Sequence, residues 1–288
     1  MIDYDDDVIF SIEITNGYVF RQIFELYDKL IISSIPIFFK ESGVTIRSKV
    51  ISTRDNTKLV SDIEIYTDDV LEYYINTDIT TVTNKESENP YQIEKISMST
   101  IKSILKSISK SNSIRLFRTT KDQDIKIQIK GLNIENAKIN SSIYDNIDIN
   151  ILAIDQMELT AANIKIDIGQ FCSMMKGVTR DTDKIVFKIY KNGIDIEGKN
   201  IAGTIIKNNS YGDISTLEYF ECNTGVSFIK SLSKINSMVN YSIVKISSNR
   251  NGFIKFSHKV ADFGEHNIYI TGETNNDTDT PLNSSLLF

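Results

Sequence analysis

The sequence predicts an α+β protein built from two similar domains, each with antiparallel sheets and two helices on one face. The first observation behind this prediction is an internal repeat. Residues 17–48 and 168–198 each run from a helix-like stretch into a short strand, a turn centred on Gly43 or Gly193, and a second strand. Glycine suits both turns because it supplies the positive φ that a tight hairpin commonly needs. The turns lie half a chain apart, so we expect one copy of this arrangement in each half.

The second observation is another matching pair of helices, predicted over residues 97–112 and 223–239. Both contain the order Ile-Lys-Ser-hydrophobic. The first has an apolar stripe at helical spacing, formed by Ile101, Ile104, Leu105 and Ile108. A basic stripe at i, i+4 and i+8 is formed by Lys102, Lys106 and Lys110. The predicted helix is therefore apolar on one side and positively charged on another.

The third observation is a series of short runs that alternate polar and apolar residues: KLVSDIEIY, SIRLF, DIKIQIKG, KIVFKIY, SIVKIS and FIKFSHKV. This period of two indicates half-exposed antiparallel strands. The polar segment 76–92 contains Pro90 and is predicted to be an exposed loop. The predicted organisation is an N-terminal domain (1–147), an interdomain connector (148–163), a C-terminal domain (164–272) and a flexible tail (273–288).

Composition and motifs argue against an enzyme. Cys172 and Cys222 have no metal-binding spacing, and we interpret them as reduced core residues. His258 is expected in a strand and His266 in a turn, neither with a catalytic partner. No phosphate loop, GxGxxG or HExxH occurs. We therefore predict no catalysis, no cofactor and no bound metal.

Charge and hydropathy bear on partners and location. The net charge of −6 argues against polyanion binding by the whole surface, but it allows one local basic face. The first ten residues are acidic, and no stretch approaches the ~18 apolar residues of a membrane span. We expect an intracellular protein that does not associate with membranes.

Three stretches resemble the DNA sliding clamps of the proliferating cell nuclear antigen (PCNA) family. KVADFG followed by NIYI (259–270) resembles that family's C-terminal hairpin and the aromatic strand after it, which predicts the hairpin turn at the break Asp262–Gly264. NILAIDQME (150–158) resembles its interdomain connector, and ISMSTIKSILK (96–106) resembles its second helix. Asp155 and Gly272 stand where the family has prolines.

The resemblance implies a clamp fold and a function. Three protomers would close head to tail into a homotrimeric ring around double-stranded DNA, bound without sequence specificity. The ring would be a processivity factor that tethers DNA polymerase and other replication and repair proteins, loaded by an ATP-dependent clamp loader. The implied location is the site of DNA replication, which is the nucleus for a cellular protein and a cytoplasmic replication site for a viral one.

The resemblance also implies three sets of site residues. The DNA-binding set on the first and second helices is Arg21, Lys29, Lys102, Lys106, Lys110, Lys176, Arg180, Lys230 and Lys234. The partner-motif groove is Leu152, Ala153, Ile154, Tyr269, Ile270 and Thr271. The subunit interface pairs the strand near 137–144 of one protomer with 184–190 of the next, through Ile139, Ile143, Tyr144, Ile185, Phe187 and Ile189.

Other interpretations stay open at this level. The chain could be a clamp-like subunit of a heterotrimer, or a monomeric processivity factor that never closes. A different class is an all-β structural or attachment protein whose two-part repeat is coincidental. The lysine stripe alone also fits a solvated amphipathic helix.

Overall fold

The computed structural model describes most of the two repeated halves. The described residues are 7–30, 32–51, 58–76, 92–132, 134–139, 141–143, 162–178, 184–190, 193–198, 202–206, 219–225, 228, 229, 232, 235, 243–248 and 253–271. Residues 77–91 of the predicted loop 76–92, residues 148–161 of the predicted connector 148–163 and the whole predicted tail 273–288 lie outside them.

The chain divides into two compact units. Unit 1 comprises Met1–Ser48, Asp62–Ile147 and Val260–Glu265, and unit 2 comprises Lys49–Ser61, Asp148–Lys259 and His266–Phe288. Each unit therefore contains a short segment from the other half of the chain. The domains predicted from the sequence, in contrast, are each one continuous stretch. The predicted boundaries of the connector and tail stay predictions.

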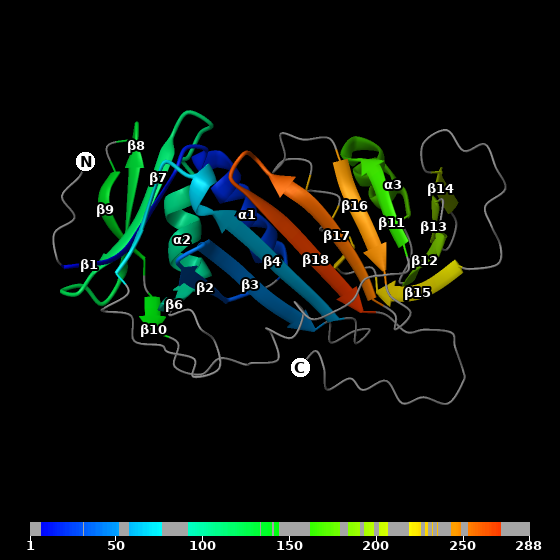
Figure 1. Ribbon diagram of the computed structural model, residues 1–288, viewed down its shortest axis with the longest axis horizontal. Coiled ribbons are helices and arrows are strands. Elements are labelled where there is room, and N and C mark those ends of the chain that lie inside the picture. The colour runs from blue at the N-terminus through cyan, green and yellow to red at the C-terminus, as the bar shows by residue number, and fades with distance from the viewer. Residues whose placement is uncertain are drawn as a thin grey trace. The chain divides into compact units, whose positions relative to one another are not determined.

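The first half contains two helices, one short 3-10 helix and ten strands (Figure 1) among the described residues. They are β1 (Val8–Ile14), α1 (Gly17–Lys29), β2 (Ser34–Lys40), β3 (Gly43–Ile51), β4 (Lys58–Tyr66), η1 (Thr67–Asp69), β5 (Glu72–Ile75), β6 (Gln92–Ser97), α2 (Met98–Leu105), β7 (Ser113–Thr119), β8 (Ile125–Lys130), β9 (Ile134–Ile139) and β10 (Ser141–Ile143). One sheet has the order β5-β1-β7-β8-β9, and a second run of strands has the order β10-β6-β2-β3-β4.

The second half has matching elements. They are β11 (Ala162–Asp167), α3 (Ile168–Val178), β12 (Lys184–Tyr190), β13 (Gly193–Glu197), β14 (Ala202–Ile206), β15 (Tyr219–Gly225), β16 (Ile243–Ser248), β17 (Phe253–Val260) and β18 (Gly264–Thr271). Helical backbone is also described at Phe228, Ile229 and Leu232, with 3-10 backbone at Ile235. The strands run in the orders β11-β16-β17-β18 and β14-β13-β12-β15.

The strand orders of the two halves correspond. In each half, the strand before the first helix joins the three strands that follow the second helix, as β1-β7-β8-β9 and as β11-β16-β17-β18. The other run is β6-β2-β3-β4 in the first half and β15-β12-β13-β14 in the second. All pairings described in register are antiparallel, as the alternating runs predicted. The predicted fold class of two similar antiparallel domains is confirmed.

The glycine hairpins occupy equivalent positions in this repeat. Lys40 pairs with Gly43 across β2 and β3, and Tyr190 pairs with Gly193 across β12 and β13. Gly43 has φ +138°, and a Cβ atom there would lie 2.0 Å from the carbonyl oxygen of Ile65. Any other residue would therefore need the neighbouring backbone to move, which explains glycine at this turn.

Aromatic side chains join the layers of each unit. In unit 1, the rings of Phe10 in β1 and Phe39 in β2 stack with centroids 3.7 Å apart. In unit 2, Phe256 in β17 contacts Phe171 of α3 and Phe187 of β12, with centroid distances of 5.4 and 5.8 Å. These rings are all buried; they join two sheets in unit 1, and they join α3 and two sheets in unit 2.

The C-terminal hairpin turns one residue earlier than expected. We predicted a break at Asp262–Gly264, whereas the turn is Ala261–Phe263 and Gly264 begins β18. Ala261 adopts φ 46°. Gly264 is required by packing instead, because a Cβ atom would lie 2.1 Å from the carbonyl oxygen of Glu64. The amide of Tyr66 donates to the carbonyl of Phe263 at 3.1 Å, so this turn bonds to the end of β4 within unit 1.

Candidate functional site

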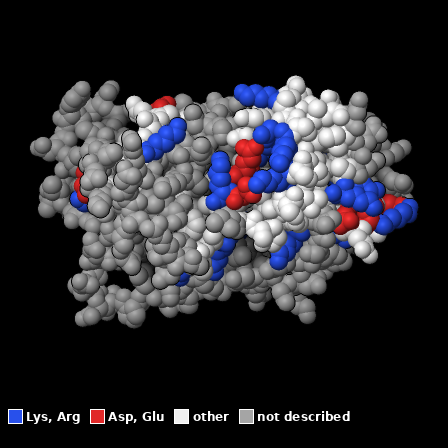
Figure 2. Space-filling view, turned by 180° about the vertical axis from the view of Figure 1, so that it is seen from behind, with Lys and Arg blue, Asp and Glu red and all other residues white. Residues whose placement is uncertain are grey.

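A charged groove of about 280 Å³ lies between α1 and α2 in unit 1. Phe24 and Leu105 form its apolar floor, each with 2% of its surface exposed. Its rim carries four cations and two carboxylates, a net formal charge of +2: Arg21, Lys29, Lys102, Lys106, Glu25 and Asp28. Basic and acidic side chains gather near the middle of the face drawn in Figure 2. The groove is therefore basic overall, but its charges are mixed.

Local sequence positions α1 so that its polar side faces this groove. The Asn16 side chain caps the helix by accepting a hydrogen bond from the Val19 amide at 3.3 Å. Beyond the cap, one side of the helix is buried through Phe20, Ile23, Phe24 and Tyr27. The remaining side carries the charged residues at spacings of three and four, which places them along one face.

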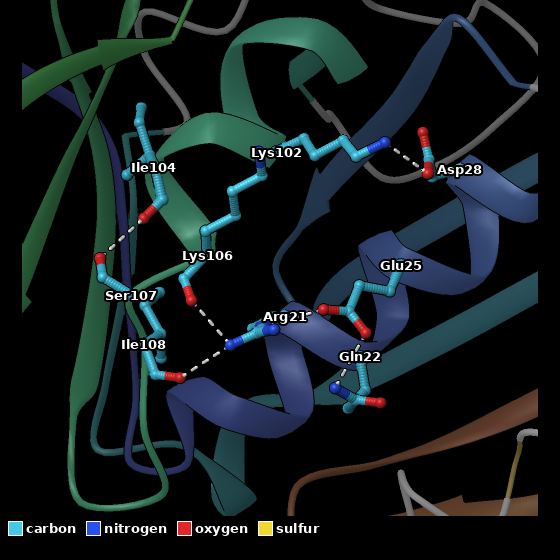
Figure 3. Close-up of polar contacts among 9 residues, drawn as sticks. All are labelled: Arg21, Gln22, Glu25, Asp28, Lys102, Ile104, Lys106, Ser107 and Ile108. Carbon is cyan, nitrogen blue, oxygen red and sulfur yellow. Dashed lines mark hydrogen bonds and ion pairs between the residues drawn. The ribbon is translucent and has the colours of Figure 1, made fainter.

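Arg21 makes three contacts with the protein itself (Figure 3). Its Nε donates to Glu25 Oε1 at 2.7 Å, and its Nη1 donates to the carbonyls of Lys106 at 2.8 Å and Ile108 at 3.4 Å. Those carbonyls belong to the turn that follows α2, where backbone acceptors lack helical partners. Only 28% of the Arg21 side chain is exposed. Arg21 therefore holds α1 to the end of α2.

Lys102 forms the second ion pair of the groove. Its Nζ donates to Asp28 Oδ2 at 2.6 Å, across from α2 to α1 (Figure 3). Both side chains remain largely accessible, with 47% of Lys102 and 40% of Asp28 exposed. An ion pair this exposed is worth on the order of 1 kcal/mol or less, because water and salt screen it.

The helix α2 is shorter than predicted and ends at Leu105 instead of residue 112. The segment after it is held by Asn112, whose side chain accepts from the Ser109 amide at 2.8 Å and donates to the Lys130 carbonyl at 3.0 Å. Serine and asparagine bond readily to nearby backbone and so compete with continued helix. Lys110 consequently lies outside the helix, with its Nζ 5.9 Å from the centre of the Tyr18 ring. The predicted three-lysine helical stripe is therefore interrupted after Lys106.

The second half carries fewer described cations. Lys176 lies on α3 and is exposed, and Asp167 caps that helix by accepting from the Gln170 amide at 2.9 Å. Cys172 is a buried free thiol that donates to the Leu232 carbonyl at 3.7 Å, as expected for a reduced core residue. Arg180, Lys230 and Lys234 lie outside the described residues. Asn223–Gly225 belong to β15, so the second helix begins later than predicted.

The predicted partner-motif groove is described on one side only. Tyr269 and Ile270 lie in β18 with 6% and 0% of their surfaces exposed, and Thr271 ends that strand. Lys255 Nζ sits 5.3 Å from the centre of the Tyr269 ring. Leu152, Ala153 and Ile154 lie outside the described residues, so this groove stays a prediction.

One of the two predicted interface strands is not an edge. β12 is bonded to β13 on one side and to β15 on the other, so 184–190 has no open edge and that prediction is wrong. Ile185 and Phe187 point into the core with 0% exposure, and of Ile189 only the backbone is described. Among the described strands, this sheet ends at β14 on one side and at β15 on the other, and β12 lies between them.

The other predicted strand does end a sheet. β9 is the last strand in the order β5-β1-β7-β8-β9, and its Ile139 is buried. Ile143 lies in β10, which pairs with β6, and Tyr144 lies outside the described residues. Any pairing by β9 would therefore use its backbone.

The two histidines form a buried chain of hydrogen bonds that the sequence did not indicate. His266 lies in β18, not in a turn, with Nδ1 3.0 Å from Nε2 of His258 and Nε2 2.8 Å from the Ser61 hydroxyl. His258 Nδ1 lies 3.0 Å from the Lys259 carbonyl. A carbonyl can only accept, so protons reside on both Nδ1 atoms and Ser61 donates to His266.

This series of hydrogen bonds has a structural and not a catalytic role. The exposed fractions of Ser61, His266 and His258 are 1%, 0% and 3%, so a substrate could not reach the hydroxyl. Burial lowers the pKa of His258 to about 4 and that of His266 well below its usual value. Both imidazoles are consequently neutral near pH 7.

Two other kinds of feature, a metal site and a membrane span, are absent from the described part of the chain. Among those residues, no group of histidine, cysteine, aspartate and glutamate side chains is arranged to hold a metal ion. No helix within the same residues is long and apolar enough to cross a membrane.

Comparisons with known proteins identify the fold. No family model matches the sequence, and no curated protein matches it. The structure is similar to the crystal structure of the PCNA2–PCNA3 complex from Sulfolobus tokodaii, with a TM-score of 0.69 and 19% sequence identity. The match covers 91% of this chain and 99% of the other. The chain therefore has the PCNA-type clamp fold that its hairpin, connector and second-helix stretches resemble.

Proposed function

From this PCNA-type clamp fold, we propose that the protein is a DNA sliding clamp, a non-enzymatic processivity factor that encircles duplex DNA. The observation that carries the proposal is the basic groove between α1 and α2, on a chain whose net charge is −6. A clamp needs cations where it meets phosphates, while its remaining surface can be acidic. Long, exposed Lys29 and Lys106 side chains suit phosphate contacts that carry no base readout.

Equivalent strands support closure of a ring. By the repeat, β9 corresponds to β18 and β14 corresponds to β4. Within unit 1, the turn before β18 already bonds to β4 through Tyr66 and Phe263. Among the strands that the structure describes, the corresponding β9 and β14 each end a sheet, which leaves backbone groups to pair. We propose that β9 of one protomer pairs with β14 of the next in a head-to-tail ring.

The proposed partners follow from this role. DNA polymerase and other replication or repair proteins would bind the groove of Leu152, Ala153, Ile154, Tyr269, Ile270 and Thr271. An ATP-dependent loader would open the ring at the intracellular site of replication. A homotrimer is the first expectation. A mixed ring is the second candidate, because the similar structure is a complex of two different subunits, PCNA2 and PCNA3.

Solution mass and DNA topology test the proposal together. Light scattering from micromolar to nanomolar concentration should give three times the 32.7 kDa chain mass for a closed homotrimer. The loaded ring should stay on nicked circular DNA and leave after linearisation. A monomer at all concentrations would favour a mixed ring or an open factor. Equal retention on circular and linear DNA would contradict encirclement.

A further inference from the structure

We propose that Asp28 limits the DNA affinity of the α1–α2 groove by acting as the internal counter-ion of Lys102. This inference rests on the proposed DNA-binding function and specifies how that surface is tuned. Lys29 and Lys106 then contact phosphates in the groove without first leaving a carboxylate. Lys102 binds a phosphate only after it leaves Asp28.

The geometry places Asp28 in competition with a phosphate. Lys102 Nζ and Asp28 Oδ2 are 2.6 Å apart, which is the spacing of a charge-assisted hydrogen bond. The 47% exposure of Lys102 leaves the ammonium within reach of a ligand above the groove. Since the ammonium already has an anionic partner, a phosphate gains only the difference between two similar contacts. Asp28 also adds a negative charge that repels the duplex.

Asp28 differs in this respect from Glu25, the other carboxylate on the rim. Glu25 pairs with Arg21 and also accepts from Gln22 Nε2 at 3.1 Å. Arg21 is held further by two backbone carbonyls after α2, so removal of Glu25 would leave it anchored. Arg21 is thus a positioning residue that fixes the turn bearing Lys106. Asp28 is the carboxylate whose loss releases a cation.

The arrangement suits a protein that must move along DNA. A lysine that exchanges between a carboxylate and successive phosphates passes through states of similar energy, so no single register of the duplex is strongly preferred. Within the part of the chain that the structure describes, no ion pair includes Lys29 or Lys106. Of the three lysines that line the groove, Lys102 is therefore the one that a described carboxylate restrains.

Salt-dependent binding to a short fluorescent duplex tests the inference. The variants are Asp28→Asn, Lys102→Gln and the double variant, with anisotropy measured across a range of salt concentrations. Asp28→Asn should bind several-fold more tightly and steepen the plot of log K against log salt by about 0.9, the value for one added phosphate contact. The double variant should return to the native slope. Asp68→Asn is the matched control, since Asp68 is exposed on η1 outside the groove and loses the same charge.

Each outcome decides the question. Equal effects of Asp28→Asn and Asp68→Asn, with DNA binding by the native protein intact, would overturn the inference and leave the proposed function standing. Absence of salt-dependent binding by every variant would overturn the proposed function itself. A second comparison does not depend on Asp28 variants: Lys106→Gln should weaken native binding more than Lys102→Gln, and the reverse order would contradict a restrained Lys102.

Discussion

The first helices of the two halves, α1 and α3, begin alike and differ in charge. Both start after a capping side chain, Asn16 or Asp167, and both bury a phenylalanine four residues later. Five residues after the cap stand Arg21 in α1 and Cys172 in α3. Each donates to a carbonyl at or after the second helix of its half, at Lys106 and Ile108 or at Leu232.

The difference at this position explains the different charge balance. Arg21 brings a positive charge, and Glu25, one turn further along α1, neutralises it. The thiol of Cys172 is neutral and needs no counter-ion, and the position equivalent to Glu25 is the exposed Lys176. The hydrogen bond from the first helix to a carbonyl at or after the second helix is thus donated by a charged guanidinium in one half and by a neutral thiol in the other. The arginine version leaves one cation fewer for the proposed DNA-binding surface, because Glu25 neutralises it.

The largest expected effects test whether the buried sides of the helices are equivalent. Phe20→Ala and Phe171→Ala should each lower the free energy of unfolding by about 3–5 kcal/mol, because each empties a site in a close-packed core. Urea denaturation followed by circular dichroism measures both. Gln170→Ala, at an exposed position of α3, is the control and should change little. A cost below about 1 kcal/mol at either phenylalanine would break the equivalence.

Acid should act on the second unit first. His258 and His266 have pKa values below 6.5 in the folded chain. At a pH between the folded and unfolded pKa values of each histidine, the unfolded chain therefore binds more protons than the folded chain. Stability is therefore highest above pH 6.5 and is lost as pH falls toward 4. For His258 alone the loss is about 1.4 kcal/mol per pH unit, and hydrogen exchange should accelerate in β17 and β18 before β1 and β7.

The variant His258→Gln separates this effect from general acid unfolding. It removes one buried imidazole, so its free energy of unfolding should fall less steeply between pH 6.5 and 5 than that of the native chain. An identical pH dependence in both proteins would show that the histidines do not control acid stability.

The positioning role of Arg21 predicts a smaller loss. Arg21→Ala removes hydrogen bonds from a charged donor that is partly exposed, so we expect a cost of about 1–2 kcal/mol. Glu25→Gln should cost less, because the two carbonyl contacts of Arg21 remain. Thermal unfolding of both variants gives the comparison. If Glu25→Gln costs as much as Arg21→Ala, the stabilisation by Arg21 comes from its ion pair with Glu25 within α1 and not from the carbonyl contacts that reach the turn after α2.

The smallest effects concern the shared helix starts. Asn16→Ala and Asp167→Ala should each destabilise by about 1 kcal/mol, since each leaves a first-turn amide without its acceptor. Asn16→Asp and Asp167→Asn keep an acceptor and serve as controls. Similar costs at the two sites would sharpen the comparison between α1 and α3, and a negligible cost at one site would show that its helix starts without the cap.

Much of the fold was predictable because local patterns repeat. The two glycine hairpins, the alternating strands and the apolar stripe beginning at Ile101 each follow from residue spacing within a short window. The end of α2 was not predictable in this way. The helix-competent segment after Leu105 is stopped by Asn112 and Arg21, whose contacts with Lys130 and Lys106 depend on distant parts of the chain.

The candidate site was predictable in composition and not in pairing. The sequence indicated Lys102 and Arg21 as cations, but their bonds to Asp28 and Lys106 depend on how α1 and α2 pack. Likewise β12 was predicted to be an edge strand, and only the sheet order places it inside its sheet, with β14 at one end. The buried ion pair between Arg47 Nη2 and Asp62 Oδ2, which are 2.6 Å apart, was also not predictable. Strand alternation does not indicate which charged side chains pair with each other in the core.

The sequence by itself determined that the chain consists of two antiparallel, helix-bearing halves, because hydrophobic periodicity and turn residues act over short distances. Tertiary structure alone decided which strands end the sheets, which histidines meet, and which cations of the α1–α2 groove are held by carboxylates. The physical reason is that edges, buried polar networks and ion pairs arise from contacts between residues far apart in the chain. Periodicity carries no information about those contacts.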